Sequence, residues 1–145
     1  MHPTVINDPV FGELKFDPTD YLLWYKGVAQ FAPDEDVEII IYTEGGEPFE
    51  ILHRARTAFA VIQHREPEYR RFAAQNLLAA YNGDWNEGQP IDAETFVGRI
   101  SLCRFSFHPD GKAQLDYDDD DMFLGHSIAV RLNEDLNVSE VGLEG

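Results

Sequence analysis

The apolar residues of this chain repeat with one period near its two ends and with a different period in its middle. Val10, Gly12, Leu14 and Phe16 alternate with polar residues, which is the pattern of a half-buried strand. The same alternation predicts further strands over residues 21–28, 37–42, 103–107, 113–117 and 128–132, with a short last strand around 138–143. Strands are therefore expected before residue 48 and after residue 100, and not between them.

Between residues 48 and 82 the apolar spacing changes to three or four. The stripe of the first helix consists of Phe49, Leu52, Ala55, Phe59 and Ile62. Pro67 interrupts the pattern, and proline removes a hydrogen bond from a helix interior. We therefore expect two helices, 48–63 and 67–82, that form an antiparallel hairpin. A short third helix is expected after Asp92, a natural N-cap.

Helices that are segregated from strands in the order βββ-ααα-βββ favour the α+β class. The expected fold is an antiparallel β-sheet of five or six strands, with the helical hairpin and the short third helix packed on one face. No repeat and no Ser/Gly-rich linker divides the sequence, so residues 1–145 are expected to form a single α+β domain.

The charge of the chain is large and unevenly distributed. The formal net charge is −16, yet residues 48–83 carry five arginines against three acids and are net positive. Residues 1–47 and 111–145 are both strongly acidic. This charge argues against unaided binding to DNA, RNA or an anionic membrane, and favours a protein partner with a basic surface. The alternative is that the charge only keeps the protein monodisperse.

Searches for catalytic and cofactor motifs find none. The sequence has no GxGxxG or Walker-type loop, no HExxH and no GxSxG, so no cofactor is expected. Its one cysteine, Cys103, excludes an intramolecular disulfide and favours a cytoplasmic location. Beside Phe105 and Phe107, Cys103 is interpreted as a small buried apolar residue. A binding protein is favoured over an enzyme.

The acidic run that begins at Asp116 is the candidate site with the most specific residue pattern. Its spacing begins like a calcium loop, but Asp121 and Ser127 stand where that loop needs glycine and glutamate. Asp118 and Asp120 remain as candidates for binding a cation. The alternative is a solvated, self-repelling loop. Asparagine at the four aspartates, 118–121, is expected to raise stability slightly by relieving repulsion and, if the protein binds a basic partner, to slow association at low ionic strength.

Further candidates follow from residue type and position. His126 shares strand parity with Ile128, so it is expected on the core side, either as a structural residue or as a general base tuned by Asp121. Large aromatic residues are favoured both in cores and as interface anchors. The residues that we expect to bind a partner are Asp118, Asp119, Asp120, Asp121, Trp24 and Trp85.

Two motifs together give a resemblance to a known family. Phe11-Gly12-Glu13-Leu14 opens the first strand, and Phe123-Leu124-Gly125-His126-Ser127-Ile128 precedes a late apolar strand. This set resembles an uncharacterised family of bacterial domains of unknown function that has an FGxL opening strand and an FxGHxI closing motif. The resemblance implies an α+β bacterial cytosolic protein and carries no established activity. Gly125 indicates a tight bend that turns Phe123 into the core, so Phe123 and Ile128 are expected to be buried.

Three classes of function remain open. The first is a small acidic protein-binding domain, in its specific form an immunity or antitoxin-like inhibitor of a basic toxin. Small acidic domains similar to this one often act as antidotes to polymorphic toxins, which is an association and not a mechanism. The second is a metal-dependent or His/Asp-based enzyme that uses residues 118–126. The third is a structural or regulatory domain.

Overall fold

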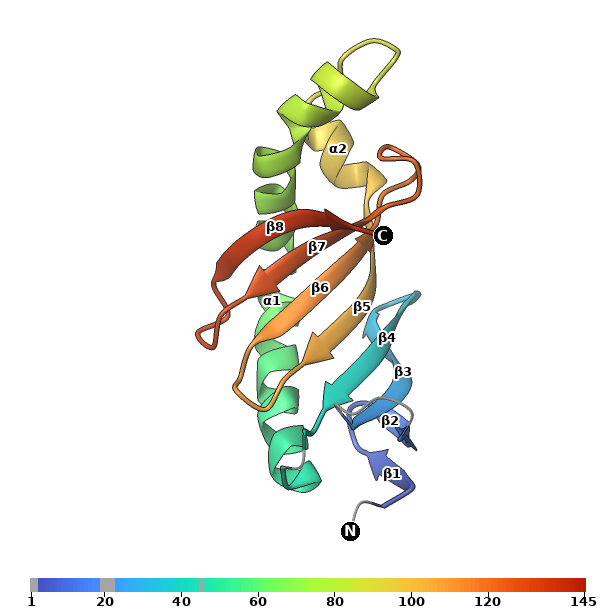
Figure 1. Cartoon of the computed structure of the whole chain (residues 1–145), viewed down its shortest axis with the longest axis vertical. Coiled ribbons are helices and arrows are strands. Elements are labelled where there is room, and N and C mark those ends of the chain that lie inside the picture. Colours follow the sequence, from blue (N-terminus) through green and yellow to red (C-terminus); the bar gives the residue numbers. More distant parts are fainter. Residues whose placement is uncertain (1–2, 19–22, 45) are drawn as a thin grey trace.

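A computed structural model describes residues 3–18, 23–44 and 46–145, and it shows one twisted sheet with helices against it (Figure 1). The strands lie in the sheet in chain order, and neighbours are antiparallel except for β4 and β5, which are parallel. The strands are β1 (Val5–Asp8), β2 (Gly12–Asp17), β3 (Trp24–Ala32), β4 (Glu35–Tyr42), β5 (Ser101–Phe107), β6 (Ala113–Asp118), β7 (Ser127–Leu132) and β8 (Val138–Glu144). The expected start of a strand at Tyr21 lies outside the described residues.

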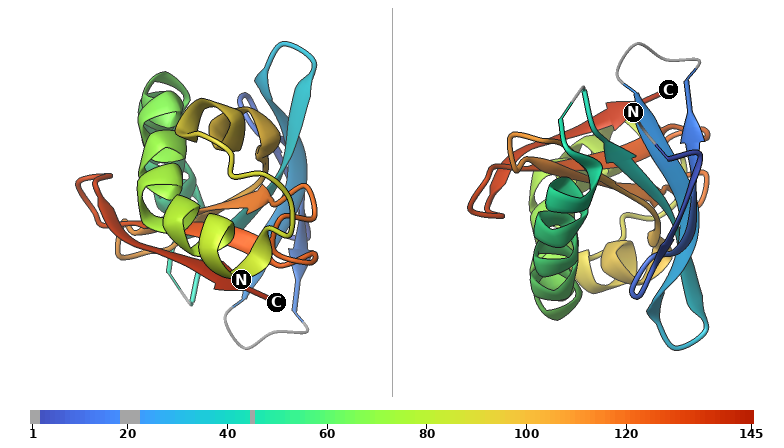
Figure 2. Two further views of the ribbon diagram at one scale, coloured as in Figure 1. Left: turned by 90° about the horizontal axis from the view of Figure 1, so that it is seen from above. Right: turned by 90° about the horizontal axis from the view of Figure 1, so that it is seen from below.

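One long helix and one short helix connect β4 to β5. Helix α1 spans Pro48–Ala80, begins with proline in its first turn and is capped by the side chain of Glu47. A π-helical turn follows over Tyr81–Trp85, and α2 spans Ala93–Arg99. The expected cap of α2 is confirmed, because the Asp92 carboxylate accepts a hydrogen bond from Thr95 N at 2.8 Å. Both helices lie on the same side of the sheet (Figure 2).

The expected antiparallel sheet of five or six strands with a helical hairpin and a third helix is wrong. The sheet has eight strands and is mixed, and the two helices expected at 48–63 and 67–82 are one helix that passes through Pro67. Tertiary contacts hold the chain helical there. Tyr69 is fully buried and its hydroxyl donates to the Leu136 carbonyl at 2.7 Å, and Arg70 Nη1 donates to the Ile100 carbonyl at 2.7 Å.

The continuity of α1 also explains the parallel pair of strands. A hairpin of two helices would return the chain to the end of the sheet where β4 stops, and β5 would then run antiparallel to β4. A single helix of 33 residues, roughly 50 Å at 1.5 Å per residue, instead carries the chain to the opposite end. The chain re-enters the sheet there through α2, so β5 runs in the same direction as β4 (Figure 1).

Replacing Pro67 by alanine is expected to raise the free energy of unfolding by about 2 kcal/mol. Proline costs about 3 kcal/mol in a helix interior, of which about 0.4–1 kcal/mol is returned because proline restricts the unfolded chain. Pro67 is exposed, so no packing is lost with its ring. Guanidinium unfolding measures the change. At Pro48, in the first turn, the same substitution is expected to bring no gain, and an equal gain at both positions would contradict the argument.

The main core lies between α1 and the face of the sheet that the helices cover. Phe123 and Ile128 are both fully buried, as expected from the sequence. Four residues of the predicted helix stripe lie in the core: Leu52, Ala55, Phe59 and Ile62. Phe49, the first residue of that stripe, is exposed, so the prediction was wrong there. No helix in the described part of the chain is long and apolar enough to cross a membrane.

Candidate functional site

The other face of the sheet, called here the open face, carries polar residues in rows that cross the strands. Successive residues of a strand point to opposite faces, so each core residue leaves a neighbour on the open face. In one row Glu38 of β4 lies beside Arg104 of β5, which lies beside Asp116 of β6. In the next row Ser106 pairs with Gln114, and Gln114 pairs with Arg131 of β7.

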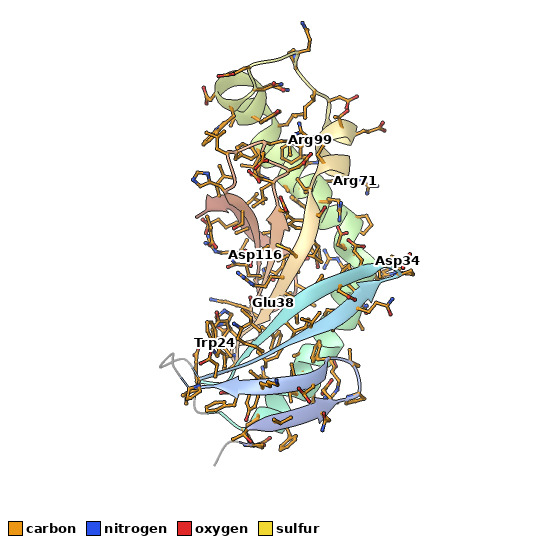
Figure 3. All side chains as sticks on the ribbon, turned by 90° about the vertical axis from the view of Figure 1, so that its right-hand side faces the viewer. Trp24, Asp34, Glu38, Arg71, Arg99 and Asp116 are labelled. Atoms are coloured by element: carbon orange, nitrogen blue, oxygen red, sulfur yellow. The ribbon has the colours of Figure 1, made fainter. Side chains whose placement is uncertain are left out.

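A groove of about 420 Å³ hollows the open face across these rows. Figure 3 shows three of its residues, Trp24, Glu38 and Asp116, following one another across the sheet, with Arg71 and Arg99 far away toward the end near α2. The groove is lined by Trp24, Lys26, Glu38, Ile40, Tyr42, Arg104, Ser106, His108, Gln114, Asp116 and Glu144. Charged, amide and aromatic groups from five strands and the β5–β6 turn therefore converge on one hollow.

Ion pairs organise the middle of the groove. Arg104 Nε lies 2.9 Å from Glu38 Oε1, and Arg104 Nη1 lies 3.9 Å from Asp116 Oδ2. Asp116 is 3% exposed, and this burial raises the pKa of its carboxyl group above the ordinary value, while the hydrogen bond from Gln114 and the charge of Arg104 oppose the shift. Arg131, at the edge of the groove, pairs with both Glu140 and Glu144.

An aromatic row forms one end of the groove. The rings of Trp24 and Tyr42, on paired residues of β3 and β4, lie 5.4 Å apart between centroids. Tyr42 also stacks on His108, with centroids 4.4 Å apart and an interplanar angle of 11°. Lys26 Nζ lies 5.5 Å from the centre of the Trp24 ring, a cation–π distance. The groove is therefore lined both by carboxylates and by the faces of aromatic rings.

The open face and α1 differ in the sign of their net charge. The basic segment of the sequence is α1, whose five arginines lie on the helix side. The acidic ends of the sequence contribute strands and the loops between them, and on the open face acidic positions outnumber basic ones. By strand register the acidic positions are Glu13, Asp17, Asp36, Glu38, Asp116, Asp118, Glu140 and Glu144, and the basic ones are Lys15, Lys26, Arg104 and Arg131.

The acidic run that the sequence singled out forms the end of β6 and the loop to β7. Asp119 is 3% exposed, and its carboxylate accepts hydrogen bonds from the backbone N–H groups of Asp121, Phe123 and Gly125 at 3.1, 2.8 and 3.1 Å. Asp118 accepts from Asp120 N at 2.9 Å, and Asp120 pairs with Arg99 Nε at 2.9 Å. Asp121 is exposed.

The proposed cation ligands and the proposed general base make contacts within the protein. Asp118 and Asp120 are engaged as just described, and no group of three or more His, Cys, Asp or Glu side chains that could hold a metal ion occurs among residues 3–18, 23–44 and 46–145. His126 is half-buried, and its Nδ1 lies 2.6 Å from the Phe123 carbonyl oxygen. No hydrogen bond or ion pair joins His126 to Asp121 within the described part of the chain.

The two tryptophans lie in different places. Trp24 lines the groove, whereas Trp85 packs edge-on against Phe123 and His126 at the helix end, with centroid distances of 5.4 and 5.9 Å. Cys103 is exposed and not buried as expected, because a register shift between Leu102 and Arg104 turns it away from the core. Partial burial of the sulfur nevertheless raises the pKa of its thiol.

Sequence reasoning named Trp24 but missed most of the groove. Glu38, Arg104, Gln114 and Asp116 are polar residues at alternate positions of strands that were recognised from their apolar residues. The alternation of apolar and polar residues in each strand indicated that one face of the sheet is polar. Which polar residues meet depends on strand order and register, and above all on the parallel pairing of β4 with β5.

A comparison with protein families gave a match. A family model described as "Uncharacterized protein conserved in bacteria (DUF2262)" matches residues 8–143. Neither the curated proteins nor the solved structures contained a match. The matched stretch includes α1, α2 and every residue that lines the groove except Glu144. The family description names no activity, so the function has to be inferred from the surface itself.

Proposed function

The chain belongs to the DUF2262 family of uncharacterized proteins conserved in bacteria, and we propose that it is a protein-binding domain whose open face binds a partner with a basic surface. The observation that carries this proposal is the difference in charge between α1, which is net positive, and the open face, which is net negative. A net charge of −16 alone is a property of the whole chain. The open face has eight acidic and four basic positions, whereas α1 has five arginines against three acids, so the open face is the more negative of the two and the one that attracts a cationic surface.

The groove adds a concave surface into which side chains of the partner can fit. An interface needs a central region in which a few side chains of the partner are anchored, and aromatic and arginine residues are typical anchors. Trp24 and Tyr42 offer aromatic surface, and the paired charges around Arg104 offer hydrogen-bonding groups. The acidic positions around the groove are suited to steering the encounter, an effect that acts mainly on the association rate.

The specific form of the proposal is an inhibitor of a basic toxin. A toxin that acts on nucleic acid carries a cationic surface for its substrate, and an acidic face can cover that surface by the same electrostatic attraction. Partners of this kind, and not nucleic acid or an anionic membrane, fit the charge of the open face. A single-domain organisation of the whole chain and a cytoplasmic location belong to the same proposal.

The enzyme alternative has less support in the structure. The His126 ring is oriented by the Phe123 carbonyl, and Asp119 is occupied by three backbone amides. These contacts give the 118–126 segment an architectural role. The open face, by contrast, has a hollow with polar groups around it, so we place function there.

Neutralising exposed acids of the open face is expected to slow association with the partner. The variant Asp36→Asn/Asp118→Asn/Glu140→Gln removes three negative charges outside the groove. At low ionic strength the association rate should fall by about tenfold, with little change in dissociation, since steering of this kind acts over roughly a Debye length. The partner is first captured from the source bacterium with the full chain, and surface plasmon resonance at increasing salt then measures both rates.

The matched control removes three negative charges from the helix side. Glu50, Glu68 and Glu94 are exposed on α1 and α2, and their replacement by glutamine gives the same net charge. The control is expected to associate nearly as fast as the parent. Equal slowing of both variants would mean that only the total charge matters, and unchanged rates in both would remove the open face as the binding surface.

A further inference from the structure

Asp116 is a buried carboxylate in the groove that lacks a complete set of hydrogen bonds. Its Oδ1 accepts from Gln114 Nε2 at 2.8 Å. Within the described part of the chain no group donates a hydrogen bond to Oδ2. The cation nearest to Oδ2 is Arg104 Nη1 at 3.9 Å, which is an ion-pair distance but too long for a hydrogen bond.

Arg104 is drawn away from Asp116 by another partner. Its Nε donates to Glu38 Oε1 at 2.9 Å, on the side of β4. A buried charge that is incompletely paired carries a desolvation cost, and this cost is relieved when a charged donor reaches the free oxygen. Asp116 lines the groove, so a group that enters the groove can reach it.

The open face also indicates which cation would fit. Two arginines of the protein itself already lie between carboxylates on the open face. Arg104 lies between Glu38 and Asp116. Arg131 lies between Glu140 and Glu144. A guanidinium group is planar, donates in several directions and stacks on aromatic rings. Glu38, Asp116 and Glu144 offer acceptors around the groove, and the Trp24–Tyr42 pair offers an aromatic wall.

We propose that Asp116, at the floor of the open-face groove, anchors one arginine side chain of the partner, with Glu38 and Glu144 as flanking acceptors. This inference rests on the proposed function, because it assumes that a basic protein surface meets the open face. It goes further in naming the residue type that enters the groove and the carboxylate that receives it.

The test uses a small probe, so it does not depend on knowing the partner. N-acetyl-arginine amide is titrated into the full-length protein, and N-acetyl-citrulline amide serves as a neutral probe of the same shape. The side-chain NMR signals of Gln114 and Trp24 report on the groove. The arginine probe should shift both signals in a saturable way, and the citrulline probe should bind at least about tenfold more weakly, because its group cannot form charge-assisted hydrogen bonds.

Two single variants complete the test. Asp116→Asn should weaken binding of the arginine probe by about tenfold, whereas Asp118→Asn, which removes one exposed charge from the same face two residues away, should change it by less than about twofold. Because burial raises the pKa of Asp116, its ionised form opposes folding at neutral pH. Asp116→Asn should therefore melt no lower than the parent at pH 7, and this relative benefit should disappear at acid pH.

The outcomes separate this inference from the proposed function. If citrulline binds as tightly as arginine, or if Asp116→Asn binds arginine as the parent does, Asp116 is not the anchor, although the open face can still bind the partner through its other acids. The proposed function fails separately if the variant at Asp36, Asp118 and Glu140 associates with the partner as fast as the parent. Loss of the folded NMR spectrum in Asp116→Asn would assign the residue a structural role and overturn the inference.

Discussion

Phe123→Ala is expected to lower the free energy of unfolding by about 3–5 kcal/mol, the range for truncating a buried aromatic side chain. Phe123 is fully buried where the β6–β7 loop meets the helices. Its ring contacts Tyr81, Trp85 and Phe96, with centroid distances of 5.6, 5.4 and 6.3 Å. Alanine would leave a cavity among three aromatic rings that cannot close around it. Urea or guanidinium unfolding, with matched slopes, measures the loss.

Leu124→Ala is the matched control for this prediction. Leu124 is the next residue in the same loop, it is 79% exposed, and its φ of 58° is as unfavourable for alanine as for leucine. Its replacement should change stability by less than about 0.5 kcal/mol. A cost below about 1 kcal/mol at Phe123 would mean that the loop repacks, and the architectural interpretation of the FxGHxI motif would then be wrong.

The recognisable parts of this fold are those that short stretches of sequence specify by themselves. The strands at 103–107 and 113–117, the Asp92 cap and the buried positions of Phe123 and Ile128 all follow from local pattern, and the structure confirms them. The joined helix does not follow from local pattern. Pro67 is a helix breaker by propensity, and the contacts of Glu66, Arg70 and Tyr69 with other elements keep the chain helical.

This one local error changed the topology. A helical hairpin implies an antiparallel β4–β5 pair, and a single long helix implies the parallel pair that is observed. The first strand, Val5–Asp8, was missed for a different reason. It is four residues long, and it is recognised by its pairing with β2 and not by alternation.

The candidate site was still harder to predict, because it is made by the register of strands that are far apart in the sequence. Glu38 and Arg104 are separated by 66 residues and meet only through the parallel pair. The conspicuous aspartates, in contrast, were found easily but are largely occupied in the structure. The cluster of aspartates in the sequence indicated the 118–121 loop as a candidate site. The incomplete pairing of one buried carboxylate, that of Asp116, is visible only in the structure.

Asp119→Asn is expected to lower the free energy of unfolding by about 2–4 kcal/mol, since hydrogen bonds to a charged acceptor are worth about 1.5–3 kcal/mol each. The carboxylate accepts three backbone hydrogen bonds within one loop, two of them on Oδ2. An amide nitrogen in the place of Oδ2 would face the N–H groups of Phe123 and Gly125, donor against donor. A flipped amide would instead face the N–H of Asp121, so neither rotamer satisfies the loop.

The neighbouring aspartate provides the control and decides what the acidic run is for. Asp121 is exposed and has a φ of 59°, a conformation that asparagine tolerates, so Asp121→Asn should be neutral or slightly stabilising by relief of repulsion. Sequence alone predicts a slight gain when residues 118–121 all become asparagine. The contacts of Asp119 predict a net loss for that fourfold change, recovered when Asp119 is kept. If thermal melts show instead that all four single variants are equally mild, the run is a solvated surface, and the Asp119 hydrogen bonds contribute nothing to the closing motif.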